Sequence, residues 1–441
     1  MEFKHDFGVR EKPMDETLQA ARKIIHPKTG IVKNLGRILF FNDEPKICTF
    51  VANLCDTSVF SDCYKQDEIT GGVSFDSKIA ELRALAEAME RYCSAIYKEK
   101  DFVIAAHKDI ERDAVNPVEF RKFSVKQLSR PQFKICRFDE KTEFRWTEAY
   151  SFFKRKNIMV PAQLVYVPYS FRKERIIRLP ISTGSACGIT YSGAIYRGLC
   201  EVVERDAFMI YYLNKMPAAE VDLEASENDA IGKLVSAYRR YRLEIRVFDI
   251  TTDIQIPVFL GILVDRTGKG PAITVGAKAG LDAEKTIIGA MEEAYLTRPW
   301  IRELLLKPDE RISERNELLD DIDKRGIFWS KRNMIKHLDF LLKSKETKSV
   351  NEYKKVGKKN MLEVCFSFLK KMDVFFRDLT TPEIREIGFK VVKILIPQMH
   401  PLHLNEEYKY LGGERLYSVP ETLGFHRKRG GELNRIPHPF L

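Results

Sequence analysis

A pair of glutamates followed by an arginine occurs twice in this chain with the same spacing. The first copy is in "ALAEAMERY" (84–92), with Glu87, Glu90 and Arg91, and the second is in "GLCEVVERD" (198–206). Residues three apart on a helix lie on the same face, so each pair of carboxylates points in one direction. Two neighbouring carboxylates repel each other, and burying them requires a cation.

A divalent metal meets this requirement better than the adjacent arginines, because Arg91 and Arg205 lie on a neighbouring helix face. Magnesium takes hard oxygen ligands and bridges carboxylates to the phosphates of a substrate. Arginine beside such a site holds phosphate oxygens bidentately. Two of these helices facing each other would therefore cradle a nucleoside triphosphate with one or more Mg²⁺ ions.

A solvated helix face is the alternative interpretation of a single Glu-x-x-Glu-Arg motif. Both copies, however, have small or apolar neighbours and follow a glycine-rich stretch, which indicates buried helices. The chain contains neither a Walker loop (G-x-x-x-x-G-K-[ST]) nor a G-x-G-x-x-G that opens a helix. If this protein uses ATP, it does so through an unusual site.

Three stretches of the chain share one organisation: small residues, then a helix with a carboxylate cluster, then an arginine. They are residues 70–97, 182–212 and, in a looser form, 275–304. Strand patterns lie around and between them, at 37–41, 47–54, 150–168, 243–251, 256–265, 372–380 and 389–397. These patterns predict a mixed α/β (α+β) fold with three related helical units.

The composition is that of a globular protein, with 44% hydrophobic and 31% charged residues among 441. The sequence shows neither a secretory signal nor an apolar stretch of about 18–20 residues, so a cytoplasmic protein without membrane contact is expected. The eight cysteines form no Cys-x-x-Cys pair, which predicts reduced thiols. His400 and His403 have no cysteine or acidic partner nearby in the sequence, so no metal site is expected there.

The net charge is +10 and the pI about 9.0. Much of the excess lies in residues 341–360, which contain seven lysines and two glutamates. This segment is either a solvated loop or a docking surface for an acidic partner or peptide. No zinc finger, aromatic RNA-binding signature or basic zipper accompanies it, so nucleic acid is not an expected partner.

Over residues 65–441 the chain resembles the YcaO family. The family's first nucleotide motif, S-x-x-E-x-x-E-R, matches "ALAEAMER" with Ala84 in place of the serine, and its second matches "STGSACG" followed by "EVVERDA". The third, an A-x-x-E-A helix with a trailing arginine, matches "AMEEAYLTR", and "DLTTPEIREIGFKVVKILIPQMHPLH" resembles a late strand-and-loop signature. The resemblance implies a YcaO fold whose mixed sheets and long helices carry the nucleotide-site glutamates.

The resemblance also implies an enzyme that uses ATP and Mg²⁺ to phosphorylate a backbone amide oxygen. On that basis, magnesium would be held by Glu87, Glu90, Glu201 and Glu204, and ATP would be contacted by Lys78, Arg91, Ser182, Arg205, Glu293 and Arg298. Family members often have an asparagine and a glutamate where this chain has Ile189 and Gly193. This departure leaves open the number of metal ions and a non-catalytic, nucleotide-binding accessory role.

The chain ends in "IPHPFL" and resembles azoline-forming members, which end in Pro-x-Pro-x-Pro. Here Pro437 and Pro439 are kept and Leu441 replaces the third proline. Alternating prolines hold a stiff, extended tail, which would aim the carboxylate of Leu441 or the imidazole of His438 as a proton acceptor. A surface-docked or frayed tail is the alternative.

The resulting prediction is a cyclodehydratase that converts Cys, Ser or Thr residues of a ribosomally made peptide to thiazolines or oxazolines. A thioamide-forming enzyme that uses an external sulfur donor is the runner-up. A precursor peptide, a separate E1-like, leader-binding protein and a second copy in a homodimer are the expected partners. We expect residues 1–64 to pack as a segment on a YcaO domain of residues 65–441, with a charged helical segment at 303–360 and a tail at 436–441.

Overall fold

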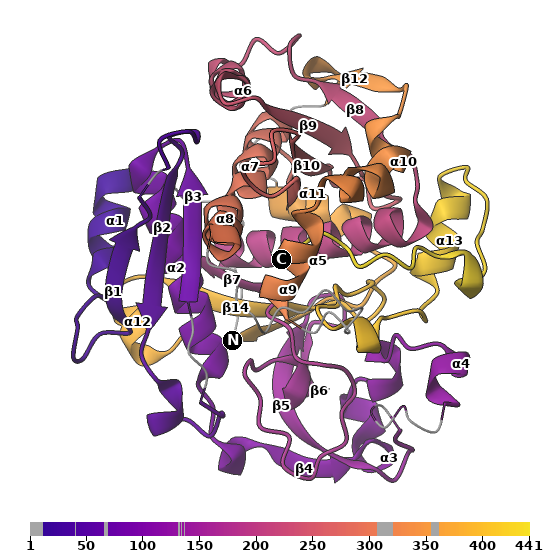
Figure 1. Cartoon of the computed structure of the whole chain (residues 1–441). Coiled ribbons are helices and arrows are strands. Elements are labelled where there is room, and N and C mark those ends of the chain that lie inside the picture. Colours follow the sequence, from indigo (N-terminus) through magenta and orange to yellow (C-terminus); the bar gives the residue numbers. More distant parts are fainter. Residues whose placement is uncertain are drawn as a thin grey trace.

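The computed structural model describes residues 12–39, 41–65, 69–130, 133, 135, 137–306, 321–353 and 361–441. Its main strands form three sheets, and long helices run between the sheets (Figure 1). The N-terminal sheet is antiparallel with the order β1-β2-β3. Its strands cover Val32–Arg37, Cys48–Leu54 and Ile69–Ser74.

The second sheet has five strands in the order β11-β10-β9-β8-β12, all antiparallel except the β8–β12 pair. These strands cover Ala219–Asp222 (β8), Leu243–Asp249 (β9), Val258–Asp265 (β10), Ile273–Ala279 (β11) and Thr347–Ser349 (β12). All eight residues of β10 are buried. Leu260 and Ile262 belong to one hydrophobic cluster and Phe259 and Leu263 to another, so this strand contributes to a core on each face of the sheet.

The third sheet is antiparallel with the order β4-β5-β13-β14-β7, and β6 pairs with β5. Its strands cover Val103–Ala106 (β4), Glu143–Ser151 (β5), Lys156–Pro161 (β6), Ser185–Gly188 (β7), Phe375–Asp378 (β13) and Lys390–Leu395 (β14). The sheet therefore joins the middle of the chain to its last quarter.

The longest helices are α2, Ser77–Ala95, and α5, Tyr191–Asn214. The other α-helices are α1 Met14–Arg22, α3 His107–Ile110, α4 Val125–Leu128, α6 Asp229–Arg240, α7 Ala283–Leu296, α8 Arg298–Leu306, α9 Ile322–Trp329, α10 Asp339–Leu342, α11 Met361–Phe368, α12 Pro382–Glu386 and α13 Arg415–Thr422. Helix α5 crosses the middle of the molecule, and the C-terminus lies beside it (Figure 1).

Short polar residues start the two long helices. The Asp76 carboxylate accepts hydrogen bonds from the N–H groups of Lys78 and Ile79 at the start of α2, and the Thr190 hydroxyl accepts one from Gly193 N–H at the start of α5. Such caps satisfy N–H groups that have no partner within the helix. Most residues of α5 are buried, because it packs against the five-stranded sheet and the C-terminal part of the chain.

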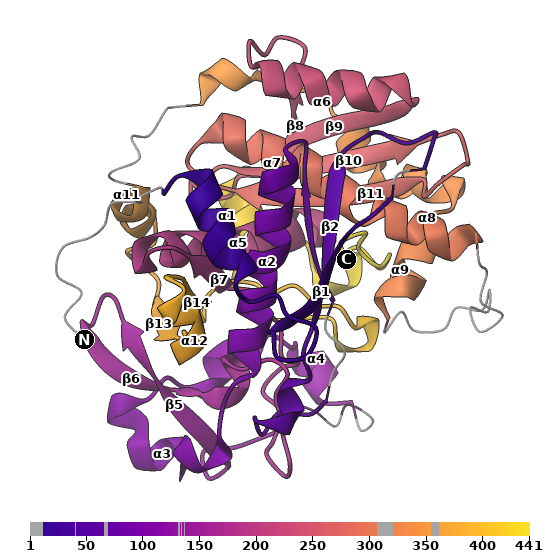
Figure 2. The same cartoon turned by 90° about the vertical axis from the view of Figure 1, so that its left-hand side faces the viewer.

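Three strand–helix units correspond to the three related stretches of the sequence: β3–α2, β7–α5 and β11–α7. Each helix packs against its own strand and also against the strand of the next unit, so α2 contacts β7, α5 contacts β11 and α7 contacts β3. The three helices lie near one another in both views (Figures 1 and 2). The units therefore form a closed ring, in which the end of each strand faces two helices.

The predicted mixed α/β fold is confirmed, and so are strands at 47–54, 150–168, 243–251, 256–265, 372–380 and 389–397. The predicted strand at 37–41 is wrong. Strand β1 ends at Arg37, and residues 38, 39 and 41 lie in no strand, while residue 40 is outside the described residues. Leu39 is 87% exposed, so the apolar run of this segment is not buried in a sheet.

The charged segment at 303–360 is described in part and contains short helices and β12. Trp329 and Leu338 are buried in the main core, and β12 extends the five-stranded sheet, so this part packs on the rest of the molecule. Within 341–353, Lys348 pairs with Asp249 at 2.8 Å, and residues 354–360 are not described. The docking surface predicted at 341–360 stays a prediction.

Seven cysteines lie in the described part of the chain, and all are free, as predicted. No helix among the described residues is long and apolar enough to cross a membrane. The N-terminal segment contributes β1 and β2 to the sheet that contains β3. The proposed domain boundaries stay predictions.

Candidate active site

The ring of strand–helix units brings the predicted metal ligands to backbone N–H groups. Each of the four glutamates accepts one hydrogen bond from a strand or from the residue before it. The pairs are Gly71 N–H to Glu87 (3.0 Å), Cys187 N–H to Glu90 (2.7 Å), Gly184 N–H to Glu201 (3.0 Å) and Ala279 N–H to Glu204 (3.2 Å). In each motif the first glutamate binds its own unit, and the second binds the next.

Gly184 shows why a glycine precedes β7. Its φ of +85° lies in the left-handed region, and a Cβ here would come within 2.3 Å of the Ile394 carbonyl oxygen. Only glycine adopts this conformation without strain and fits this space. The tight turn directs the Gly184 N–H toward Glu201.

Burial and the repulsion of neighbouring carboxylates make Glu90 and Glu204 hard to ionise. Burial is the largest cause that raises the pKa of Glu90 to about 8; the Cys187 hydrogen bond acts against it, and the charges of Glu201 and Glu87 add to it. Burial also raises the pKa of Glu204 to about 8, with Glu293 and Glu201 adding to the rise against Arg205 and Lys278. These mutual effects place carboxylates from all three helices in one electrostatic environment.

Three cations accompany the cluster, each next to a motif glutamate. Arg91 Nη2 lies 3.3 Å from Glu87, and Arg205 lies 3.7 Å from Glu201 and 3.4 Å from Glu204. Lys278, on β11, lies 2.8 Å from Glu293. Lys278 was not predicted from the sequence, because nothing in the local sequence shows that its side chain passes over Gly289 of α7 toward Glu293.

The carboxylates of the cluster are ligands of the type that a divalent cation takes, although no three of the four described motif glutamates have ligand atoms within 4.8 Å of one another. Glu204 Oε1 and Arg205 Nη1 are buried and have no hydrogen-bond partner. A carboxylate oxygen in this condition lacks the interactions that normally compensate burial. Hard oxygen ligands from α2 and α5 are the donors that Mg²⁺ prefers, and a cation here would offset the repulsion that raises the pKa values of Glu90 and Glu204.

The other predicted ATP contacts are not all brought to the cluster. Ser182 lies in the loop before β7, where its carbonyl accepts a hydrogen bond from Ser185 N–H at 2.8 Å. Lys78 lies in the first turn of α2 and pairs with Asp15 at 2.6 Å. Nine helical residues separate Lys78 from Glu87, a rise of about 13 Å. The contact of Lys78 with ATP stays a prediction, because its ion-pair partner is Asp15 and not a residue of the glutamate cluster.

Arg298 belongs to a different cluster. It is 2% exposed, pairs with Glu44 at 2.8 Å and with Asp265 at 2.7 Å, and donates to the Pro271 carbonyl. Asp265 lies at the end of β10 opposite to the one that pairs with Ala279. These contacts direct the guanidinium away from Glu204, so its predicted role toward ATP also stays without a supporting contact.

The C-terminal tail enters the molecule and reaches Arg205. The Phe440 ring is 3% exposed, and its centroid lies 4.0 Å from the Arg205 guanidinium carbon. The Pro437 carbonyl accepts hydrogen bonds from the Tyr212 hydroxyl (2.9 Å) and Trp329 Nε1 (3.0 Å). The end of the chain is therefore fixed beside the second glutamate motif.

His438 is held inside the molecule by the backbone of His403. It is 1% exposed, and its Nε2 lies 2.5 Å from the His403 carbonyl oxygen, so Nε2 must be the donor. Burial, with the charge of Arg325, holds the pKa of His438 well below its usual range. The imidazole is therefore neutral, and its lowered pKa makes Nδ1, which is buried without a hydrogen-bond partner, a weak acceptor for a substrate proton.

His403, Glu406 and His438 gather at this position. The expectation that His403 has no acidic partner nearby is wrong, because Glu406 follows it by three residues and lies 3.7 Å from it. The possible ligand atoms of the three residues all lie within 4.8 Å of one another. Glu406, however, already pairs with Arg325 at 2.8 Å and with Lys409 at 2.7 Å. Two cations on one carboxylate disfavour a further cation, so we assign this cluster to the anchoring of the tail.

The two departures from the family motif lie in ordinary structural surroundings. Ile189 packs against the core that contains α2, and Gly193 lies in the first turn of α5 with its N–H bound to Thr190. Neither position supplies a polar side chain to the site.

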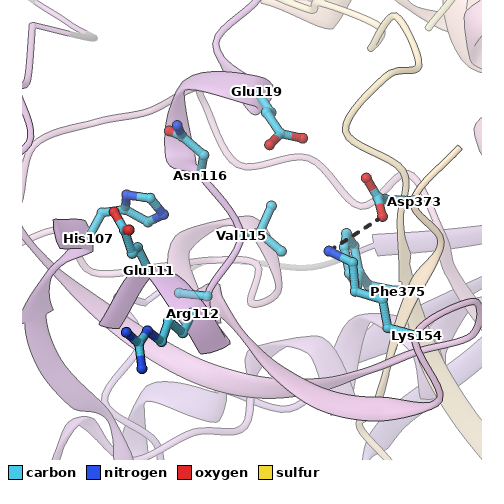
Figure 3. Close-up of a pocket in the computed structure, with 10 residues that line it drawn as sticks. His107, Glu111, Arg112, Val115, Asn116, Glu119, Lys154, Asp373 and Phe375 are labelled. Atoms are coloured by element: carbon cyan, nitrogen blue, oxygen red, sulfur yellow. Dashed lines mark ion pairs between the residues drawn. The ribbon is translucent and has the colours of Figure 1, made fainter. Parts of the chain in front are cut away.

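A separate cavity of about 310 Å³ lies between the loop after α3 and β13 (Figure 3). Lys154 and Asp373 form an ion pair of 3.8 Å at one side of it, and burial together with Asp373 raises the pKa of Glu119. None of the predicted site residues lines this cavity.

Comparisons with known proteins agree with this geometry. A protein-family model described as "YcaO cyclodehydratase, ATP-ad Mg2+-binding" matches residues 71–400. An uncharacterised protein of Methanothermobacter thermautotrophicus is 26% identical over 336 residues, which cover 74% of this chain and 80% of that protein. A protein of Rhizobium leguminosarum bv. trifolii, described as uncharacterised in the tfuA 3′ region, is 30% identical over 27% of this chain and 29% of its own length.

Solved structures share the fold. A heterocyclase in complex with substrate and cofactor has a TM-score of 0.82 and 24% identity, and the heterocyclase TruD has a TM-score of 0.69 and 21% identity. The match covers 100% and 98% of this chain but only 59% and 55% of those two chains. The structure of YcaO from Methanopyrus kandleri bound with AMPPCP and Mg²⁺ has a TM-score of 0.62 and 16% identity, over 90% of this chain and 94% of that one.

Proposed function

This chain belongs to the YcaO family, and we propose that it activates backbone amides of a peptide with ATP and Mg²⁺. The proposed reaction is the cyclodehydration of Cys, Ser or Thr residues to thiazolines or oxazolines in a ribosomally made peptide. The shared fold with two heterocyclases supports this reaction. The structure of a relative in complex with AMPPCP and Mg²⁺ supports the two cofactors.

The gathering of four motif glutamates from α2 and α5 carries this proposal. Glu87, Glu90, Glu201 and Glu204 would hold Mg²⁺, which supplies positive charge for the phosphates of ATP when both are bound. Arg91 and Arg205 would contact phosphate oxygens from the sides of the cluster, because each lies beside a metal-holding carboxylate. Ser182 and Glu293 would border the nucleotide, and Lys278 joins them through its ion pair with Glu293.

We leave Lys78 and Arg298 outside the proposed site, because their partners lie elsewhere. In the tail, the proton acceptor would be the carboxylate of Leu441 rather than the imidazole of His438. Pro437 and Pro439 would hold the tail in its extended course. Pro437 does so through its carbonyl, and Pro439 through its contact with the apolar cavity lined by Phe208 and Tyr211.

The proposed partners are a precursor peptide, a separate protein that presents it, and a second copy of this chain. A microcin synthetase complex with pro-MccB17 bound has a TM-score of 0.57 and 14% identity to this chain, over 85% of this chain and 90% of that one. That structure contains a synthetase complex with pro-MccB17 bound to it.

A non-catalytic accessory protein is the second candidate, and Ile189 and Gly193 favour it. Both positions are apolar and engaged in packing or capping, so a polar contact and one possible metal ligand are missing. A thioamide-forming enzyme with an external sulfur donor would use the same glutamates and differs in its product.

The test is isothermal titration of the whole protein with AMPPCP and Mg²⁺, alongside a Glu201→Gln/Glu204→Gln double variant. We expect binding by the wild type, none by the double variant, and unchanged binding by Glu421→Gln, which removes an exposed carboxylate. Turnover with a candidate peptide is then followed by mass spectrometry. Loss of one water per modified residue supports an azoline, and replacement of oxygen by sulfur supports a thioamide. Binding without any turnover favours the accessory role.

A further inference from the structure

The last aromatic residue of the chain meets the arginine of the second glutamate motif. The Phe440 ring lies 4.0 Å from the guanidinium carbon of Arg205, well within the distance of a strong cation–π contact. The ring also packs against Phe208 of α5, with centroids 5.1 Å apart. The Phe440 ring thus contacts two side chains of α5, the helix that bears Glu204: the Arg205 guanidinium and the Phe208 ring.

The tail is fixed upstream of this contact by several independent hydrogen bonds. Trp329 and Tyr212 donate to the Pro437 carbonyl, and Arg325 donates to the His438 carbonyl at 2.9 Å. The position of the Phe440 ring is therefore set by α5 and α9 together. An aromatic ring fixed in this way restricts the cation stacked on it.

The geometry of Arg205 shows this restriction. Its distances to Glu201 and Glu204 are 3.7 and 3.4 Å, whereas arginine–carboxylate hydrogen bonds are typically about 2.7–2.9 Å. Arg205 Nη1 and Glu204 Oε1 are both buried and lack a hydrogen-bond partner, although they belong to neighbouring groups of opposite charge. The guanidinium therefore stays near the carboxylates without closing on them.

We infer that Phe440 is a positioning residue of the metal site. Its ring holds the Arg205 guanidinium beside Glu201 and Glu204 and prevents it from forming a bidentate pair with either, so both carboxylates stay available to a divalent cation. The identification of that cation as Mg²⁺ rests on the proposed function; the stacking contact itself does not. Loss of the ring would let Arg205 close on the carboxylates and compete with the metal.

The test measures Mn²⁺, a paramagnetic substitute for Mg²⁺, bound to metal-free full-length protein by electron paramagnetic resonance. Phe440→Leu should weaken Mn²⁺ binding between about twofold and about thirtyfold, the range of a cation–π contact. Phe440→Tyr, which keeps the ring, should restore wild-type affinity. Phe340→Leu is the matched control, because Phe340 packs on Tyr212 in the same core without a stacked cation.

A double-mutant cycle separates this role from a general loss of packing. In an Arg205→Gln background, Phe440→Leu should cause no further loss of Mn²⁺ affinity. An equal loss in that background, or unchanged affinity of Phe440→Leu in the wild-type background, overturns the inference.

The wild type is also titrated with AMPPCP. Binding of Mn²⁺ without binding of the nucleotide refutes the proposed function and leaves the positioning role intact. Failure of the wild type to bind Mn²⁺ refutes the positioning role.

Discussion

Replacing Glu90 with glutamine should stabilise the metal-free protein. The pKa of Glu90 is raised from 4.5 to about 8, so at pH 7.5 the folded protein holds a proton that the unfolded chain has lost. Three pKa units between 4.5 and 7.5 amount to about 4 kcal/mol. Relaxation and solvent screening around this half-buried side chain reduce the expected gain to about 2 kcal/mol. Glutamine keeps an oxygen that can accept the Cys187 hydrogen bond.

The sign of the pH dependence follows from the raised pKa. The cost of Glu90 is absent below the unfolded pKa near 4.5, grows as the pH rises, and levels off above a pH of about 8. The difference between Glu90→Gln and wild type should therefore be near zero at pH 4.5 and largest above pH 8.

Scanning calorimetry in EDTA across this pH range measures the difference, which at pH 7.5 should be about 2 °C for a chain of this length. Glu421→Gln should show no such trend, because its exposed ion pair with Arg427 contributes little. A Glu90→Gln variant that is less stable than wild type at pH 7.5 would refute the reasoning. It would mean that Glu90 is ionised and favourably paired without a metal.

Three further outcomes are expected. Because Glu90 and Glu204 have pKa values of about 8, Mg²⁺ binding at pH 7 should release protons and at pH 9.5 should not; titration calorimetry in buffers of different ionisation enthalpy counts them, and equal counts at both pH values contradict this. Glu44→Gln should lower the free energy of unfolding in urea by about 1.5–3 kcal/mol, because it removes the negative charge that Arg298 and Arg302 share and leaves each of them with one carboxylate, Asp265 or Asp43. Gly184→Ala should weaken Mn²⁺ binding, because a Cβ there clashes with the Ile394 carbonyl; wild-type affinity would count against the role of this turn.

The sequence was sufficient to predict the two long helices and the pairing of their glutamates. Helical spacing is a local property, and Glu-x-x-Glu places both carboxylates on one face in any surroundings. The strands in the glycine-rich leaders were not predicted. Strand β7 has only four residues, "SACG", without a β-branched or aromatic side chain, and it exists because β14 pairs with it.

The predicted ATP contacts of Arg298 and Lys78 stay predictions, because the partners of both side chains lie elsewhere in the structure. Arg298 follows Glu293 by five residues, but α7 ends at Leu296 and a new helix, α8, begins at Arg298. The change of direction turns Arg298 toward Glu44. Lys78 lies on the same helix as Glu87, yet the rise of α2 carries it to the other end of the site. In both cases the tertiary arrangement, not the spacing, decides which side chains meet.

The ring of units gives a physical reason for the repetition of the motif. The second glutamate of α2 binds β7, and the second glutamate of α5 binds β11. Helix α7 closes the ring through Glu292, which accepts hydrogen bonds from Ser74 and from Phe75 N–H at the end of β3. Glu90, Glu204 and Glu292 thus each accept a backbone hydrogen bond from the strand, or the end of the strand, of a neighbouring unit. One unit alone would expose its carboxylates to water, with ordinary pKa values and little affinity for a metal. The raised pKa values and the proposed metal affinity therefore depend on the contact of all three units. This is why a single Glu-x-x-Glu-Arg motif on a solvated helix does not by itself indicate a metal site.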